Sequence, residues 1–260
     1  MKVTILGARG SIPTEGRDML EFGGGTSCVL AESDDQAIFL DAGTGIINSP
    51  DIGDKAITIL LTHPHLDHIL GIPFFPYIFE KERRIDFYAA KAGDYSAYEQ
   101  LDTVYTNPIW PCRVVDYAAD VRIHDAELPL KLGNVTVTAM PSVHPGGGLV
   151  YRLDEDGRSV VYATDYEYEE DKIGELIDFC KGCDLLLFDA QYTDEEFIAR
   201  RGYGHSTVAQ GMEVMEKAGV KNIRFVHHDP RHTDDFLREM ERPIKSASAA
   251  FARKDEVIIL

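Results

Sequence analysis

The segment Leu61–Gly71 constrains this chain more than any other, because three histidines and an aspartate fall within six residues of it. The four side chains are His63, His65, Asp67 and His68. They directly follow the apolar run Ala56–Leu61, which we predict to be a buried strand. The cluster therefore lies at a strand end, where rigid scaffolds commonly present ligands. Neutral imidazole and carboxylate suit Zn²⁺, Mn²⁺ or Fe²⁺, so we interpret the cluster as a metal site rather than a solvated turn.

The order of residues in the cluster favours two neighbouring ions. Pro64 prevents a regular helix or ladder at its own position, which helps His63 and His65 to face a common point. His68 follows Asp67 immediately, so this pair can face an adjacent point and hold a second ion.

Length and composition exclude several classes of protein. The chain has 260 residues, enough for one α/β domain with a large core, and we expect a single domain over residues 1–260. The first residues lack the long apolar region of a signal peptide, and no apolar run could span a bilayer. Four cysteines in such a chain suggest reduced thiols and a cytoplasmic location. The net charge of -18 argues against tRNA or DNA as a partner, because phosphate backbones are met with Lys and Arg.

The remaining pattern is that of an α/β protein. We predict strands at 2–6, 26–31, 37–40, 56–61, 85–90, 134–139, 149–153, 159–163, 184–188 and 222–226. We predict helices at 94–101, 169–179, 206–218 and 234–250, with Gly219 capping the third and Pro243 interrupting the last. Mixed strands early and strand–helix units late predict sheets covered by helices.

Two further features flank the cluster. Glycine loops at 7–13, 23–25 and 41–45 are ordinary tight turns taken singly, but beside a metal cluster they become candidate walls of a site. Residues 73–125 form an aromatic-rich insertion. We expect most of its rings to serve core and dimer packing, with one or two stacking on a flat substrate as the alternative.

Three other strand ends carry metal-ligand residue types. Predicted strands lead directly or within a few residues to His144, Asp165 and His227. Each alone is more commonly structural. Together with the first cluster they give the pattern of a two-metal site, with histidines for each ion and a carboxylate to bridge them. His228 competes with His227; strand alternation favours His227 and gives His228 a supporting role.

At this point the chain resembles the metallo-β-lactamase-fold hydrolases, whose HxHxDH motif matches His63–His68. The later ligands follow in that family's order. The resemblance implies an αββα sandwich and two divalent ions, Zn²⁺ first and Mn²⁺ or Fe²⁺ as alternatives. It implies one metal held by His63, His65 and His144, the other by Asp67, His68 and His227, and a bridge at Asp165.

The segment Gly204–Thr207 resembles the GHST segment of the ribonuclease Z branch, which cleaves phosphodiesters. The strand 184–188, ending in Asp189 and Ala190, is similar to that branch's strand with an acid–alanine pair. One interval departs from ribonuclease Z: only 20 residues (165 − 144) separate His144 from Asp165, where ribonuclease Z carries a long tRNA-gripping arm. The short interval and the acidic net charge together argue against tRNA as the substrate. The chain then resembles the small cyclic-nucleotide phosphodiesterases of the branch.

We therefore predict a dinuclear phosphodiesterase acting on a small, cyclic phosphodiester such as a nucleotide. Asp67, His205 and Asp189 are the residues expected in catalysis: Asp67 through the metal, His205 protonating the leaving oxygen, and Asp189 holding its ring. The alternatives are a thioester or lactone hydrolase of the same fold and a catalytically silent metal-dependent sensor. We further expect a homodimer, plain buried thiols at Cys180 and Cys183, and surface or loop positions for His124 and His232.

Overall fold

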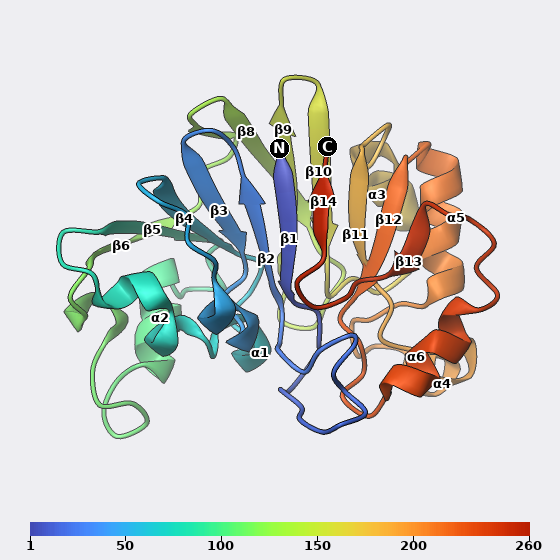
Figure 1. Cartoon of the computed structure of the whole chain (residues 1–260), viewed down its shortest axis with the longest axis horizontal. Coiled ribbons are helices and arrows are strands. Elements are labelled where there is room, and N and C mark those ends of the chain that lie inside the picture. Colours follow the sequence, from blue (N-terminus) through green and yellow to red (C-terminus); the bar gives the residue numbers. More distant parts are fainter.

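Two seven-stranded mixed sheets form the centre of the molecule, and helices cover their outer faces (Figure 1). The computed structural model describes all residues from 1 to 260. The predicted αββα sandwich is confirmed. None of the helices combines the length and the apolar character that a membrane-spanning helix requires.

The first sheet has the order β14-β1-β2-β3-β4-β5-β6. Its strands are β1 (Lys2–Gly7), β2 (Cys28–Glu32), β3 (Gln36–Leu40), β4 (Ala56–Leu61), β5 (Arg84–Ala89), β6 (Asp120–Asp125) and β14 (Val257–Ile259). The strands from β3 to β6 run parallel, so their carboxyl ends meet at one edge.

The second sheet has the order β13-β12-β11-β10-β9-β8-β7. Its strands are β7 (Leu130–Leu132), β8 (Val135–Pro141), β9 (Leu149–Glu155), β10 (Arg158–Ala163), β11 (Leu185–Asp189), β12 (Asn222–Val226) and β13 (Ala249–Phe251). Strands β10, β11 and β12 run parallel, and β8 shares their direction because it is antiparallel to β9, as β10 is. The ends of these four strands therefore lie at one edge.

The helices lie between strands or at their ends. The α-helices are α1 (Leu66–Ile69), α2 (Ala97–Val104), α3 (Ile173–Phe179), α4 (Asp194–Ala199), α5 (Val208–Ala218) and α6 (Asp234–Glu241). The 3-10 helices are η1 (Thr44–Asn48), η2 (Ile72–Phe74), η3 (Pro76–Phe79) and η4 (Val114–Asp116).

Three apolar cores follow from this layering. One lies between the sheets and includes Val3 and Leu185, one from each sheet. The other two lie on the outer faces, under α2 on the first sheet and under α3 and α5 on the second. The strands that reach the middle, such as β4 and β11, are continuous apolar runs because both of their faces are covered.

The structure corrects several predicted boundaries. The helix predicted at 234–250 ends at Glu241, since a helix cannot pass Pro243, and the chain then forms β13 beside β12. The helix predicted at 169–179 begins only at Ile173, because residues 169–172 form a turn. The helix predicted at 94–101 begins after Ser96, whose hydroxyl and Glu99 form a capping box, and it continues to Val104.

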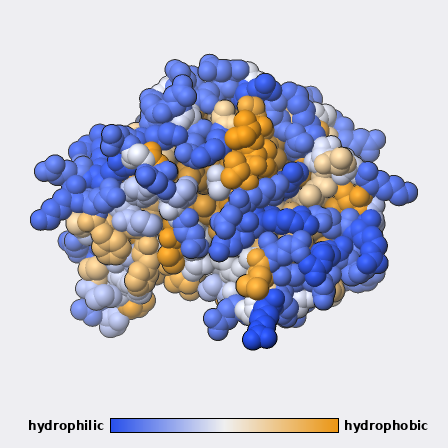
Figure 2. Space-filling model, in the orientation of Figure 1, coloured by the Kyte–Doolittle hydropathy of each residue, from blue (hydrophilic) through white to orange (hydrophobic).

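The aromatic segment 73–125 contributes β5 and β6 to the first sheet. Rings such as Phe75 and Tyr105 are buried in the core, whereas Phe74 and Phe79 are more than half exposed. Figure 2 shows apolar side chains gathered over this segment, at the lower left, and a second compact patch over β14.

Candidate metal centre

The motif His63–His68 lies where β4 gives way to the single-turn helix α1. Pro64 separates His63 from His65, and His65 occupies the N-cap position of α1. The side chain of His65 comes to 2.8 Å from His63 (Nδ1 to Nε2) and to 3.3 Å from His144 Nε2. These three histidines, which we name the first ligand group, place their ring nitrogens around one point.

Asp67, His68 and His227 form the second ligand group. Asp67 Oδ2 lies 3.3 Å from His68 Nε2 and 3.4 Å from His227 Nε2. His227 comes from the end of β12 on the other sheet. Its neighbour His228 turns away, with its ring against Phe22 and Phe251.

Asp165 lies between the two groups. Its Oδ2 is 3.2 Å from His68 Nε2, and its Oδ1 is 3.3 Å from His227 Nε2. The same Oδ1 lies 3.8 Å from Nε2 of both His63 and His144. A carboxylate so placed can be shared by two ions. Ligation of a metal by these seven residues stays a prediction, but the structure brings all seven together.

The donor set fits two divalent cations. His68 Nε2 and His227 Nε2 are buried and have no hydrogen-bond partner, although buried polar atoms in proteins are nearly always paired. Both nitrogens face the carboxylates of Asp67 and Asp165, which a cation would share with them. Asp165 and His227 also hold positive φ angles, 51° and 62°, which are uncommon for residues other than glycine and are typical of functional sites.

Residues around the ligands fix their orientation. Asp41 Oδ2 accepts a hydrogen bond from His68 Nδ1 at 2.7 Å, which leaves Nε2 free for a metal. Asp41 in turn accepts the Thr62 N–H, also at 2.7 Å. Asp41 was not predicted as a site residue, although it follows strand β3 as Asp165 follows β10, and the rule that ligands stand at strand ends could have found it.

A second supporting carboxylate acts on His144. His144 Nδ1 donates to the Gly204 carbonyl at 3.1 Å. The carboxylate of Glu167 accepts the N–H groups of Gly202 and Gly204, each at 2.7 Å. Glu167 therefore holds the loop that positions His144, and no sequence pattern pointed to this residue.

Burial controls the charge of the first group. Burial lowers the pKa of His63 well below its usual value, and it lowers the pKa of His65 and His144 as well. Neutral imidazole is the form that binds metal. For His68 burial also lowers the pKa, but the carboxylates of Asp165, Asp67 and Asp41 outweigh burial and raise it.

His205 and Asp189 form a pair beside the ligands. His205 Nδ1 lies 2.8 Å from Asp189 Oδ2, and its ring stacks on that of His227 at 4.7 Å. Asp189 also accepts the Asp165 N–H at 2.9 Å. Burial lowers the pKa of His205, but Asp189 outweighs burial and raises it to about 9. A protonated imidazole next to the ligand cluster is suited to donate a proton.

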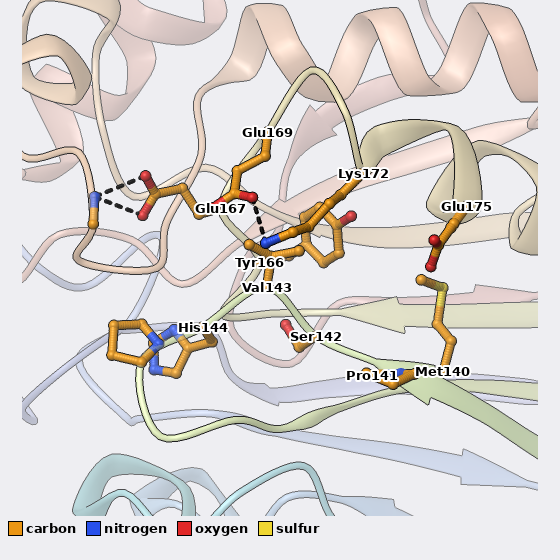
Figure 3. Close-up of a pocket in the computed structure, with 12 residues that line it drawn as sticks. Met140, Pro141, Ser142, Val143, His144, Tyr166, Glu167, Glu169, Lys172 and Glu175 are labelled. Carbon is orange, nitrogen blue, oxygen red and sulfur yellow. Dashed lines mark hydrogen bonds and ion pairs between the residues drawn. The ribbon is translucent and has the colours of Figure 1, made fainter.

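A cavity of about 560 Å³ lies beside His144, between the end of β8 and the segment that leads into α3 (Figure 3). Glu167 points toward Gly202, and Lys172 points to Glu169, 2.5 Å away. The residues that line it are Met140, Pro141, Ser142, Val143, His144, Pro145, Tyr166, Glu167, Glu169, Lys172, Glu175 and Gly202. No ring of the aromatic insertion is among them.

The other histidines and the cysteines lie away from the centre. His124 is on β6 and pairs with Asp86, 2.8 Å away, in keeping with a surface position. His232 lies in a loop, as predicted, and its ring is buried against Glu196. Cys180 and Cys183 are fully buried in the outer core of the second sheet, and burial raises the pKa of both thiols.

A family model described as "Beta-lactamase superfamily domain" matches residues 37–228. The chain belongs to the beta-lactamase superfamily. Among its curated relatives is "Probable metallo-hydrolase YhfI" of Bacillus subtilis, 24% identical over 97% of each chain. Another is "Ribonuclease Z" of Haloarcula marismortui, 21% identical over 89% of this chain and 87% of the relative.

Solved structures agree on the fold. The Bacillus subtilis YhfI structure superposes with a TM-score of 0.74 and 22% identity, covering 99% of this chain and 98% of YhfI. A diphosphatase from the PhnP family gives 0.69 and 20% identity, over 100% of this chain and 97% of the other. Zn²⁺-bound PqqB of Methylobacterium extorquens gives 0.71 and 17% identity over the whole of both chains. These superpositions show the fold. The family match, the curated relatives and the buried His/Asp cluster, typical of a dinuclear site, together indicate a metal-dependent hydrolase of this fold.

Proposed function

We propose that this protein hydrolyses a small cyclic phosphodiester, a cyclic nucleotide or a related compound. The observation that carries the proposal is the His205–Asp189 pair, which stands 2.8 Å apart and stacks against His227 of the second ligand group. An alkoxide leaving group needs a proton as it departs, whereas a thiolate does not. A buried, carboxylate-held imidazole at this place therefore favours phosphate esters over thioesters. Relatives named ribonuclease Z support the same class of reaction.

The roles divide between the ligand residues and the pair. Two divalent cations, Zn²⁺ by first expectation, supply Lewis acidity and lower the pKa of water when bound by the seven ligands. Asp165 and Asp67 are the two anionic side chains among the seven ligands and partly neutralise the charge of the cations. His205 donates its proton to the departing oxygen from Nε2, while Asp189 holds Nδ1 and stabilises the imidazolium.

The surroundings of the centre support a small substrate. Between His144 and Asp165 the chain forms only a glycine loop and the β9–β10 hairpin, which leaves no arm to grip tRNA. The net charge of -18 also disfavours polyanions. The cavity beside His144, about 560 Å³, is in the range of pockets that bind small molecules.

The proposal is tested by incubating the protein, loaded with Zn²⁺ or Mn²⁺, with a panel of cyclic mono- and dinucleotides and reading the products by mass. Bis(p-nitrophenyl) phosphate serves as the general phosphodiester, and an acyl thioester and a lactone serve as competitors. We expect ring opening of at least one cyclic phosphodiester. Acyl hydrolysis without phosphodiester turnover would favour the acyl hydrolase, and full metal loading without any turnover would favour a sensor.

We also propose that two copies associate through the aromatic segment. Phe74, Phe79, Tyr95 and Ile109 are between 53% and 68% exposed, more apolar surface than a small lid needs. Light scattering at micromolar concentration should give twice the chain mass; a mass near 29.0 kDa contradicts the dimer.

A further inference from the structure

The glycine loop at residues 7–13, which follows β1, lies directly against His227 of the second ligand group. A Cβ on Gly10 would stand 2.6–2.8 Å from three atoms of the His227 ring, so only glycine lets the main chain approach this closely. The loop is tied to the β12 end, where Gly10 N–H donates to the His228 carbonyl at 2.9 Å. Ser11 is consequently the first side chain of the loop that can reach the space above the ligands.

Ser11 adopts a conformation that is rare for its residue type. Its φ is +63°, and the Ile12 N–H donates across it to the Gly10 carbonyl at 2.7 Å, so the three residues form a tight γ-type turn. Such turns with a positive central φ are strained, and strained residues cluster at functional sites. The Ser11 N–H donates to Asp67 Oδ2 at 2.7 Å, the oxygen that faces His68 and His227.

A hydrogen bond from Gln191 orients the Ser11 hydroxyl. Gln191, which is 4% exposed, donates from Nε2 to Ser11 Oγ at 3.0 Å. The Gln191 N–H donates to Asp189 Oδ1 at 3.1 Å, so this glutamine is fixed to the carboxylate that holds His205. Ser11 is therefore connected through its N–H to Asp67 of the second ligand group, and through Gln191 to the Asp189 carboxylate that holds His205. Its hydroxyl proton has no acceptor within the protein, and the residue is exposed.

Residues 7–13 contain one cationic side chain, Arg9, and it is committed to other contacts. Arg9 is fully buried, and its guanidinium donates to the carbonyls of Gly23, Asp229 and His232. An anion held at the ligand groups thus meets a neutral hydroxyl donor on this side.

We propose that Ser11 is a substrate-binding residue whose hydroxyl donates a hydrogen bond to a non-bridging oxygen of the phosphoryl group. This assignment rests on the proposed phosphodiesterase function, because a phosphodiester must place its phosphorus between the metal ligands and His205. The ligand class is a phosphoryl anion, either the diester substrate or the monoester product.

The test compares wild-type protein with Ser11→Gly, which removes the hydroxyl and accommodates the positive φ. Glu82→Gly is the matched control, since Glu82 has a φ of +66° and is exposed on the aromatic segment away from the ligands. The probe is inorganic phosphate, titrated by calorimetry into metal-loaded protein. A hydrogen bond to a charged group is worth about tenfold or more in affinity, so Ser11→Gly should bind phosphate about tenfold more weakly. Glu82→Gly should bind it as the wild type does.

Metal content and thermal unfolding accompany the titration. Ser11→Gly should keep two metals per chain and an equal or higher melting temperature, because glycine relieves the strained turn. Equal phosphate affinity in Ser11→Gly and wild type, or a wild type that binds no phosphate, would overturn the assignment. Weaker binding together with lost metal would also overturn it, since Ser11 would then act through Asp67. If Ser11→Gly weakens phosphate binding while the wild type hydrolyses no phosphodiester, the proposed function fails and the phosphoryl contact stands.

Discussion

The two sheets each present one histidine held by a buried aspartate, and the two pairs have nearly the same geometry. On the first sheet His68 Nδ1 lies 2.7 Å from Asp41 Oδ2; on the second, His205 Nδ1 lies 2.8 Å from Asp189 Oδ2. The difference lies at the other ring nitrogen. His68 Nε2 faces the carboxylates of Asp67 and Asp165 within 3.3 Å, whereas the carboxylates near His205, those of Asp189 and Asp165, approach its Nδ1, at 2.8 and 3.9 Å.

The comparison shows that a histidine–aspartate pair can serve either metal binding or proton donation. An aspartate on Nδ1 fixes the tautomer and ring direction in both cases. A histidine so held becomes a metal ligand where Nε2 meets other ligands, and a proton donor where Nε2 is left to the substrate. The roles of His68 and His205 thus follow from their neighbours rather than from the pair itself.

The largest expected effect comes from removing the carboxylate between the groups. Asp165→Ala should lose bound metal and all hydrolytic activity together, because the Asp165 carboxylate lies within 3.8 Å of histidines of both groups. Metal content by mass spectrometry and turnover of bis(p-nitrophenyl) phosphate measure the two losses, and far-UV circular dichroism checks the fold. Two metals retained in a folded variant would contradict the bridge.

His205→Ala should separate catalysis from metal binding. If His205 is the proton donor, the variant keeps two metals per chain, and turnover of a substrate with a ribose leaving group falls by about 10²–10⁴-fold. A p-nitrophenyl ester, whose phenolate leaves without a proton, should be affected far less. The competing interpretation is structural, because Thr207 caps α5 just beyond His205. Equal losses on the two esters with metals retained would support that interpretation.

The paired aspartates give the sharpest form of the comparison. Asp41→Asn should weaken metal affinity by about 10–100-fold, because an amide beside His68 Nδ1 favours the tautomer with a proton on Nε2. Asp189→Asn should reduce metal affinity less than Asp41→Asn does, because Asp189 is hydrogen-bonded to the ligands only through the Asp165 N–H, and it should lower the pKa of His205, which Asp189 raises. A proton donor is active while protonated, so turnover of the ribose ester, lost as pH rises through that pKa, should be lost at lower pH in Asp189→Asn. Equal metal loss in both variants would erase the distinction between the pairs.

The sequence was sufficient to predict the site residues that are contiguous in the chain or that follow a strand. The run His63–His68 is contiguous, and His144, Asp165 and His227 each follow an apolar strand, so their convergence at one sheet edge could be expected. The strand-end rule could also have marked Asp41, which follows β3, but it could not have given its partner, and it gave no sign of Glu167. Asp41 meets His68 across 27 residues and Glu167 meets Gly204 across 37, and only the tertiary fold creates those contacts.

The same limit explains why two of the shortest strands were missed. Strands β13 and β14 have three residues each, too few to show a period, and both are defined by pairing with β12 and β1. Long buried strands such as β4 and β12 were predicted with their observed bounds, because an apolar run of that length has few other stable places. Gly219 caps α5 with a φ of +65°, as the sequence predicted.

The smallest effect is expected at Glu167, which supports both a metal ligand, His144, and the proposed proton donor, His205. Its carboxylate holds the loop whose Gly204 carbonyl orients His144 and whose next residue is His205. Glu167→Gln keeps one acceptor oxygen and replaces the other with a donor that faces an N–H group. Losing one such hydrogen bond should reduce both metal affinity and turnover of the ribose ester by about 3–10-fold. Glu167→Ala, which removes every bond to Gly202 and Gly204, should reduce both further.

The variants are compared by competition with a metal chelator and by steady-state kinetics. A decline in turnover alone would mean that the loop serves His205 and that His144 is held by other contacts; a decline in neither would show that Glu167 only closes the wall of the cavity.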